Sequence, residues 1–395
     1  IMSELNASNL RKEHGNEGPD LVGTTELTSP YYMVPPSGNT AERPQNPQKG
    51  TLRFNTDIGS LEFYRGDGIG WEQIQRTTPN LGGGTGSNAG TGARGVTLGG
   101  HTGGGTRSDV IDYITTSTLG NATDFGNLTS AKSNVAAFGS RTRGIASCGF
   151  HASSPNDKDD IEYITYSSTG NAIDFGNATA AKRAPTGCSS NTRGLTMGGF
   201  TSPSPTPAGQ TDVIDYITIA ATGNAVDFGN LSAVHMASTA CASSTRGIFA
   251  AGQAGPAFPN TIEFVTIATT GNATDFGDRT FVGAYGAACS NSTRGLMAGG
   301  GPSPTYKATN IDYITVATLG NASDFGDLSI QNGFFGASAT PTRGIFSGGY
   351  TGSPLSIHNI IEYVQILTTG NVVDFGDLTV SRNNTAFVTN AHGGL

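Results

Sequence analysis

Short stretches of alternating apolar and polar residues recur along most of the chain, and they predict strands rather than helices. The segment IDYITV at 311–316 places alternate residues on opposite faces, which is the period of two expected of a β-strand. Apolar segments closed by glycines, such as RGIFSGG at 343–349, predict a second type of strand. We find no apolar stripe with the 3.6-residue period of a helix. The pattern therefore predicts an all-β protein.

These strands belong to a repeat of 48–53 residues. Asp-Phe-Gly occurs six times at these spacings, and Arg-Gly occurs six times in phase with it. A period in this range is typical of propellers and repeat arrays. The repeated arginines are Arg94, Arg143, Arg193, Arg246, Arg294 and Arg343. The repeated aspartates are Asp124, Asp174, Asp227, Asp275, Asp324 and Asp374.

Each repeat contains four candidate strands, so six repeats predict a six-bladed β-propeller. After the aromatic strand comes Gly-Asn, which we expect to form a two-residue hairpin turn because both residues tolerate positive φ. The Asp-Phe-Gly segment would be its partner strand, and an Ala/Ser-rich stretch such as 283–292 the fourth strand. The chain ends on another copy of that stretch. We therefore expect Thr385 to Asn390 to supply the inner strand of the first blade and to close the propeller.

The order of an apolar strand ending in Gly-Gly, a variable loop, an aromatic strand and an outer strand resembles the kelch repeat. Gly-Gly stands at 99–100, 198–199, 299–300 and 348–349, and copies two and four depart with Cys148-Gly149 and Ala251-Gly252. The Trp usual in kelch repeats is missing, and the Phe of Asp-Phe-Gly stands roughly in its place. The resemblance implies a degenerate, six-bladed kelch-like β-propeller over residues 81–395.

Six acids also recur in phase, each directly before the aromatic residue of its strand. A ring of metal or ligand sites is one interpretation, and an arginine–carboxylate lattice that fixes strand register is the other. We favour the lattice, because a catalytic site needs groups with different pKa values rather than six equivalent ones. Asp-Phe-Gly also holds magnesium in protein kinases, but the other kinase motifs are missing. We therefore expect no catalytic residue, no cofactor and no metal. The acids are Asp112, Glu162, Asp215, Glu263, Asp312 and Glu362.

Composition narrows the function further. The net charge of -8 argues against nucleic acid as a partner. No apolar run approaches the 18 residues of a membrane span, and the first 20 residues lack the apolar region of a secretory signal. Cys188, Cys241 and Cys289 occupy one equivalent position in separate repeats, so we expect free, buried thiols. The phenylalanines of Asp-Phe-Gly and the aromatic residues of the preceding strand are the expected core.

The loops between the second and third strands differ most among the repeats. Since strands in a blade alternate in direction, these loops and the links between blades should share one face. An asymmetric ligand would be recognised there. The candidate residues are His101, His151, Phe258, Tyr306 and His358.

The first 80 residues differ from the rest. Residues 1–49 lack periodicity and contain five prolines after residue 29, which predicts an extended docking arm. Residues 50–80 alternate cleanly and predict a small β-meander with Phe54, Phe63 and Trp71 as its core. The segment GTLRFNTDIGSLEFYRGDGIGWEQI resembles a motif of bacteriophage tail-fibre and other virion surface proteins. The Asp-Phe-Gly repeats likewise resemble those of marine cyanophage virion proteins.

These resemblances imply a non-enzymatic virion structural protein, assembled in the host cytoplasm and present in many copies. Residues 1–80 would anchor it to other capsid or tail proteins, and the propeller would serve as decoration or host-contact head, without nucleic-acid binding or membrane insertion. Two alternatives stay open. One is a glycan-binding tail-fibre head that recognises host surface polysaccharide. The other is a propeller glycosidase or lyase, for which only the acids of HASSPNDKDD at 151–160 offer a cluster.

Overall fold

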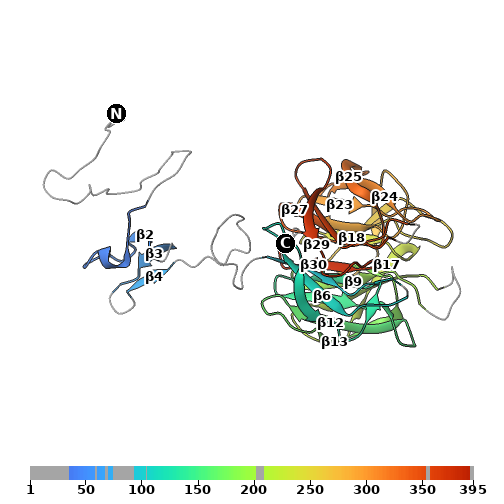
Figure 1. Ribbon diagram of the computed structural model, residues 1–395, viewed down its shortest axis with the longest axis horizontal. Coiled ribbons are helices and arrows are strands. Elements are labelled where there is room, and N and C mark those ends of the chain that lie inside the picture. Colours follow the sequence, from blue (N-terminus) through green and yellow to red (C-terminus); the bar gives the residue numbers. More distant parts are fainter. Residues whose placement is uncertain are drawn as a thin grey trace. The chain divides into compact units, whose positions relative to one another are not determined.

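The computed structural model describes residues 35–57, 60–66, 70–73, 93–103, 105–201, 209–352 and 356–391. The chain divides into two compact units, Ile1–Thr78 and Pro79–Leu395. Within these described ranges, strands and one short 3₁₀ helix occur but no α-helix (Figure 1), which confirms the all-β class. No helix of this part of the chain is long and apolar enough to cross a membrane.

The smaller unit contains a four-stranded sheet. Its elements are β1 (Ser37–Gly38), η1 (Thr40–Glu42), β2 (Leu52–Asn55), β3 (Ser60–Tyr64) and β4 (Trp71–Gln73). The three strands expected from the sequence are confirmed, and β1 adds a fourth, parallel to β2. Strand β1 lies inside the segment expected to be an extended arm. The part of that arm before residue 35 lies outside the described residues.

The two faces of this sheet have opposite character. In the antiparallel pairing of β2 with β3, Leu52 faces Phe63 and Phe54 faces Leu61. These four side chains share one face, which is half-buried except at Leu52, with 37% of its surface exposed. The residues between them in sequence point to the opposite face. That opposite face holds the most buried residues, Arg53, Asn55 and Glu62.

The expectation that Phe54, Phe63 and Trp71 form the core of this module was wrong. The buried face is built on Glu62, whose carboxylate lies 2.5 Å from Arg43 Nη2 and 3.3 Å from Arg53 Nη1. Both guanidinium groups lie 5.9 Å from the Trp71 ring, which is only half-buried. Alternation assigns residues to two faces but does not say which face is covered, and here the polar face is covered.

The larger unit contains six four-stranded antiparallel sheets in its described residues. Sheet I is β30 (Ala386–Thr389), β5 (Arg94–Leu98), β6 (Val110–Thr115) and β7 (Thr123–Asn127). Sheet II is β9 (Ala136–Gly139), β10 (Arg143–Ser147), β12 (Lys158–Thr165) and β13 (Ile173–Lys182). Sheet III is β14 (Thr186–Ser189), β15 (Arg193–Met197), β16 (Thr211–Thr218) and β17 (Val226–His235).

The remaining sheets follow the same order, from an Ala-rich first strand to an Asp-Phe-Gly outer strand. Sheet IV is β18 (Thr239–Ala242), β19 (Arg246–Ala250), β20 (Thr261–Thr266) and β21 (Thr274–Asp278). Sheet V is β22 (Ala287–Ser290), β23 (Arg294–Ala298), β24 (Ala308–Thr315) and β25 (Ser323–Asn332). Sheet VI is β26 (Gly336–Ala339), β27 (Arg343–Ser347), β28 (Ile360–Gln365) and β29 (Val373–Asp377). A small additional pair joins β8 (Lys132–Ser133) to β11 (Phe150–His151).

Sheet I contains segments from the two ends of the repeat region. Strand β30 pairs antiparallel with β5, from Ala386 opposite Leu98 to Thr389 opposite Gly95. The expected role of Thr385 to Asn390 as the inner strand beside the first repeat is therefore confirmed. The first strands of successive sheets also lie side by side, and β30 lies beside both β26 and β9.

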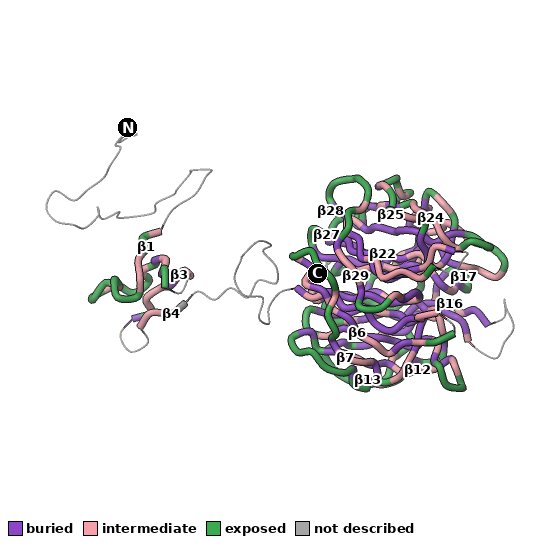
Figure 2. Tube along the Cα trace, in the orientation of Figure 1, coloured by how far each residue is buried: buried purple, intermediate pink, exposed green. Residues whose placement is uncertain are grey.

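The apolar core lies between neighbouring sheets. Each phenylalanine of Asp-Phe-Gly is only 2% exposed and meets the half-buried aromatic ring of the preceding strand edge to face, as Tyr113 does with Phe125 at 5.9 Å. One cluster joins Ile114 of sheet I to Ile345 of sheet VI. Figure 2 shows burial concentrated on the strands and exposure on the connections.

The four cysteines are free and buried, as expected for Cys188, Cys241 and Cys289. Burial raises the pKa of the Cys148 thiol to about 11 and that of Cys241 to about 12. Such thiols are inert, uncharged parts of the core.

Candidate functional site

The Gly-Asn dipeptides hold neighbouring sheets together instead of forming two-residue turns. Gly170 N–H donates to the carbonyl of Phe125 at 2.8 Å, and Asn127 N–H donates to Asn171 Oδ1 at 3.0 Å. The same hydrogen bonds recur from sheet to sheet. Gly120 N–H of sheet I donates to the carbonyl of Phe375 in sheet VI. The hairpin expected here was wrong, because the dipeptide pairs with the next sheet rather than closing a turn in its own.

This contact explains the glycine of Asp-Phe-Gly. A Cβ added to Gly277 would lie 2.5 Å from the carbonyl oxygen of Gly320, and its φ of +146° is one that other residues rarely adopt. Asp275, two positions earlier, is exposed. The motif therefore supplies a core phenylalanine and a contact glycine, with its aspartate at the surface.

The repeated arginines do not pair with the repeated aspartates, so the lattice within each blade was wrong. Arg94 Nη1 donates to the carbonyl of Tyr166 in the next sheet at 2.8 Å, and Arg343 Nη1 of sheet VI donates to the carbonyl of Thr116, which follows β6 of sheet I, at 2.9 Å. The Arg94 guanidinium also lies 4.8 Å from the Tyr113 ring. Equivalent contacts recur at all six positions. The arginine covers a ring of its own sheet and caps a carbonyl of the next one.

The in-phase acids do form ion pairs, but with other cations and between sheets. Arg382, in the link after sheet VI, places Nη2 2.5 Å from the Asp112 carboxylate of sheet I. The pairs Lys182–Asp215, at 2.7 Å, and Arg279–Asp312, at 3.2 Å, are equally buried, as is Lys132–Glu162. A buried ion pair is strongly destabilised when one partner is lost. These acids therefore have a structural role.

Two of the six acids have no cation at this position in the described residues. Glu263 and Glu362 are 4% and 6% exposed and are hydrogen-bonded to Ser232 and Ser329. Where three other links have Lys132, Lys182 and Arg382, these two links have His235 and Asn332. Burial raises the pKa of Glu362, although the Ser329 hydroxyl and backbone N–H oppose that shift.

Six link residues form a ring of backbone hydrogen bonds. Each N–H donates to the carbonyl of the preceding member, and Asn134 donates to Asn384, with distances from 2.5 to 3.1 Å. All six have positive φ between 50° and 61° without being glycine, a conformation that costs free energy and needs surrounding support. We call this the backbone ring. Its members are Asn134, Ala184, Ala237, Tyr285, Phe334 and Asn384.

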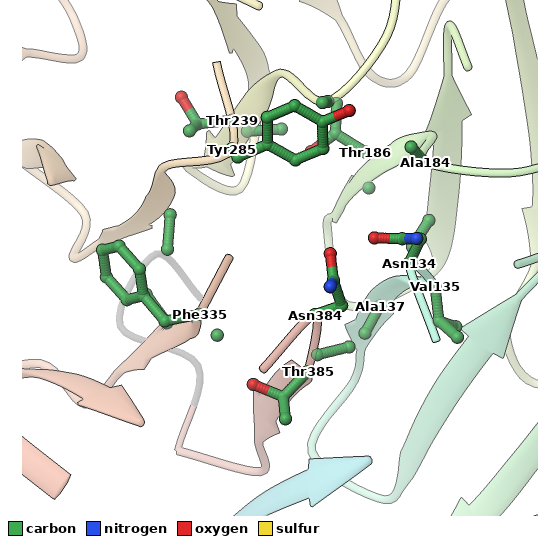
Figure 3. Close-up of a pocket in the computed structure, with 18 of the residues that line it drawn as sticks. Asn134, Val135, Ala137, Ala184, Thr186, Thr239, Tyr285, Phe335, Asn384 and Thr385 are labelled. Carbon is green, nitrogen blue, oxygen red and sulfur yellow. The ribbon is translucent and has the colours of Figure 1, made fainter. Parts of the chain in front are cut away.

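A cavity of about 120 Å³ lies beside the backbone ring, between the first strands of the sheets. Its walls carry small side chains and backbone groups, and Figure 3 shows Asn134, Thr186, Thr239, Tyr285, Phe335 and Asn384 around it. Alanines and glycines of the first strands make up much of its lining. It offers little charge for recognising a ligand.

The loop face is more distinctive. We use this name for the described residues of the connections between second and third strands, together with the links between sheets. Phe258 and Tyr306, both expected as candidates, meet there with ring centroids 5.8 Å apart. Tyr306 also contacts Tyr285 at 5.4 Å and Phe334 at 6.1 Å. An aromatic cluster thus covers the loop face over sheets IV to VI.

The three histidine candidates have separate environments. His151 is buried, with Nδ1 3.0 Å from Ser130 Oγ and Nε2 2.9 Å from Asp160. His101 is half-buried, and its pKa is lowered by burial and by Arg107. Burial also lowers the pKa of His358. No group of three potential metal ligands occurs among the residues that the structure describes.

A depression of about 510 Å³ lies on the loop face against the backbone ring. It is lined by residues of both loops and links, as expected if these share one face. Of the five candidates only His101 lines it. Its other walls are Arg107, Ser133, Asn134, Phe150, Arg183, Phe334, Tyr350, Asn383 and Asn384.

Sequence reasoning missed Tyr285, Phe334, Arg107 and Arg183. A signal for two of them was present, because Tyr285 and Phe334 stand where the other links have Asn or Ala. Comparing links as well as loops among the copies would have found them. Arg183 likewise stands where the other links have Ser133, Met236, Ala284, Gly333 and Asn383, and Arg107 lies in one of the variable loops.

Comparison of the chain with known protein families found no match, and comparison with curated proteins found none either.

Proposed function

We propose that residues 93–391 form a closed, six-bladed β-propeller of kelch-like type. Three sets of contacts support closure: the backbone ring, the arginine-to-carbonyl hydrogen bonds and the Gly-Asn contacts. Each set runs from one sheet to the next and returns from sheet VI to sheet I. The pairing of β30 with β5 supports the same arrangement. It joins the two ends of the repeat region in sheet I, so that the inner edge of β5 is not left unpaired.

We further propose that the chain is a non-catalytic virion surface protein. In this proposal the N-terminal unit attaches it to capsid or tail proteins, and the propeller displays the loop face outward. The resemblance of both units to phage virion proteins motivates the idea. The half-buried apolar face of β2 and β3 supports attachment, since an apolar sheet face is stabilised by covering it with another chain.

One observation carries the proposal. The in-phase acids that precede the strand aromatics are held in buried contacts between sheets, whereas the side chains that do not repeat gather on the loop face. Evolution of a binding surface on a constant scaffold leaves this division. A glycosidase would instead need two carboxyl groups held about 5–10 Å apart around a substrate.

The glycan-binding head remains the second candidate, and one observation favours it. The depression on the loop face combines aromatic rings with arginines and amides, a set suited to a polar ligand with apolar faces. This candidate is compatible with a virion location.

The test is to locate the chain on particles. Antibodies against the propeller should decorate intact virions, with labelling visible by electron microscopy, and mass spectrometry should find the chain in washed particles. An N-terminal unit cleaved readily by protease in isolated protein should be protected on the particle. Absence of the chain from purified particles would overturn the proposal. Release of oligosaccharides from host polysaccharide by pure protein would overturn its non-catalytic part.

A further inference from the structure

The lining of the depression on the loop face is positively charged. Its lining includes Arg107 and Arg183 but no aspartate or glutamate. The whole chain has a net charge of -8, so this local excess is opposite in sign to the average. A site of this kind attracts anions selectively.

Arg107 is the more available of the two cations. It is half-buried, and no carboxylate of the described residues lies within ion-pair distance of it. Its Nη1 donates to the carbonyl of Gly105 at 3.2 Å, and its buried Nε has no hydrogen-bond partner in this part of the chain. The guanidinium lies 4.3 Å from the Phe150 ring, which holds it in place.

Arg183 approaches the same ring from the link between sheets II and III. Its guanidinium lies 5.0 Å from Phe150 and 4.4 Å from Phe200. Its ion pair to Asp157 is long at 3.4 Å, and a third of its side chain is exposed. Both guanidinium groups therefore lie near the Phe150 ring, and both arginines line the depression.

The lining also includes aromatic rings and side-chain amides. Phe334 and Tyr350 meet edge to face at 6.0 Å, and both line the depression. Asn134 and Asn384 line it from the backbone ring. Aromatic rings pack against the C–H faces of sugars, amides hydrogen-bond hydroxyl groups, and guanidinium groups bind carboxylates in bidentate fashion.

We propose that this depression binds an acidic oligosaccharide, with Arg107 and Arg183 holding a sugar carboxylate and with Phe334 and Tyr350 packing on a neighbouring sugar ring. The volume of about 510 Å³ lies within the range of ligand sites, roughly 300–1,000 Å³. The proposal rests on the non-catalytic display function above and names the ligand class for its outward face.

A nucleic acid is disfavoured as the ligand. Nucleic acids are bound by extended basic surfaces that neutralise several phosphates. Here the positive charge is confined to one depression on an acidic chain.

The test is isothermal titration of the full chain with oligogalacturonate and oligosialate, with neutral maltohexaose as the matched uncharged probe. We expect binding of at least one acidic probe and none of maltohexaose. Arg107→Gln and Arg183→Gln should each weaken acidic binding about tenfold or more. Arg141→Gln removes the same charge from an exposed residue in the loop between first and second strands, and it should leave affinity unchanged. Tyr350→Ala should weaken binding without changing its salt dependence.

Several results would overturn the inference. These are no binding of either acidic probe, equal binding of maltohexaose, or equal losses from Arg107→Gln and Arg141→Gln. Tighter binding of a single-stranded DNA oligomer that depends on Arg107 would replace the saccharide by a nucleic acid. Thermal melting of each variant separates loss of binding from loss of folding. If the chain is present on particles but binds no acidic saccharide, only the ligand inference is overturned. If the chain is absent from particles, the proposed display function is overturned as well.

Discussion

Charged and aromatic side chains have protein partners at the sheet interfaces, whereas on the loop face they are open to a ligand. At the interfaces, Arg382 lies against Asp112, and each repeated arginine covers a ring while capping a carbonyl. On the loop face, Arg107 has no carboxylate partner among the described residues, and Tyr306 is half-exposed among other rings. The repeated residues that are buried or capped in this chain hold neighbouring sheets together. We therefore seek function where the repeat is broken, and four experiments can break or sharpen this contrast.

Removing the last ten residues should have the largest effect. The deletion takes away β30, including Phe387, which is 5% exposed, and leaves β5 without its inner partner. We expect loss of cooperative unfolding or a stability loss above about 5 kcal/mol, since Phe387→Ala alone should cost about 3–5 kcal/mol. Circular dichroism during heating measures it. Deleting only residues 392–395 is the control, and equal melting of all three chains would contradict the role of the seam.

Breaking one interface ion pair comes next. Arg382→Met leaves the Asp112 carboxylate buried without a cation, which should cost about 3–5 kcal/mol. Adding Asp112→Asn to this variant should restore part of the loss, because no unpaired charge remains. Urea unfolding gives both values. The substitution Arg141→Met, at an exposed position, should stay within about 0.5 kcal/mol of wild type. A double variant no more stable than the single one would argue against the pairing.

The motif Asp-Phe-Gly provides a matched pair of substitutions, one at its glycine and one at its aspartate. Gly277→Ala puts a Cβ against the Gly320 carbonyl at positive φ, so we expect a loss of about 1–3 kcal/mol. Asp275→Ala alters an exposed side chain and should change stability by less than about 0.5 kcal/mol. Chemical denaturation of the two variants side by side is sufficient. Similar losses in both would restore a structural role to the aspartate.

The smallest effect concerns Glu362, which has no cation beside it among the residues that the structure describes. Burial raises its pKa above the ordinary value of 4.5. Its contribution to stability is therefore fully present below pH 4.5 and is lost as the pH rises through the folded-state pKa. Glu362→Gln should gain stability relative to wild type between pH 4 and pH 8. The paired acid of sheet II provides the contrast, since Glu162→Gln leaves buried Lys132 with a weaker partner and should lose stability. A difference independent of pH would refute the shift.

Much of the scaffold could be predicted because the repeat supplies the same evidence six times. The strands, the inner position of Ala386 to Thr389 and the burial of Phe276 followed from pattern alone. Partners could not be predicted in the same way. Arg294 and Asp324 recur in phase, which suggested a pair, yet Arg294 reaches the carbonyl of Ile366 in the next sheet. In-phase recurrence identifies equivalent positions without giving the distance between them.

The candidate site was predicted only in part. Phe258 and Tyr306 were identified because their loops vary, and they do meet. His151 was identified for the same reason, but it is buried against Asp160. The composition of its loop does not predict this burial. Arg107 and Arg183 gained significance only from the ring of Phe150 that both approach.

The sequence by itself determined the strand order, the period, the buried phenylalanines and the face on which variation gathers, because these follow from local alternation and internal repetition. Tertiary structure alone decided which cations meet which acids, which face of the small sheet is buried, and where two arginines converge on one ring. The physical reason is that pattern is a property of neighbours in the chain. An ion pair or a ligand site depends on neighbours in space, and here those neighbours come from different sheets.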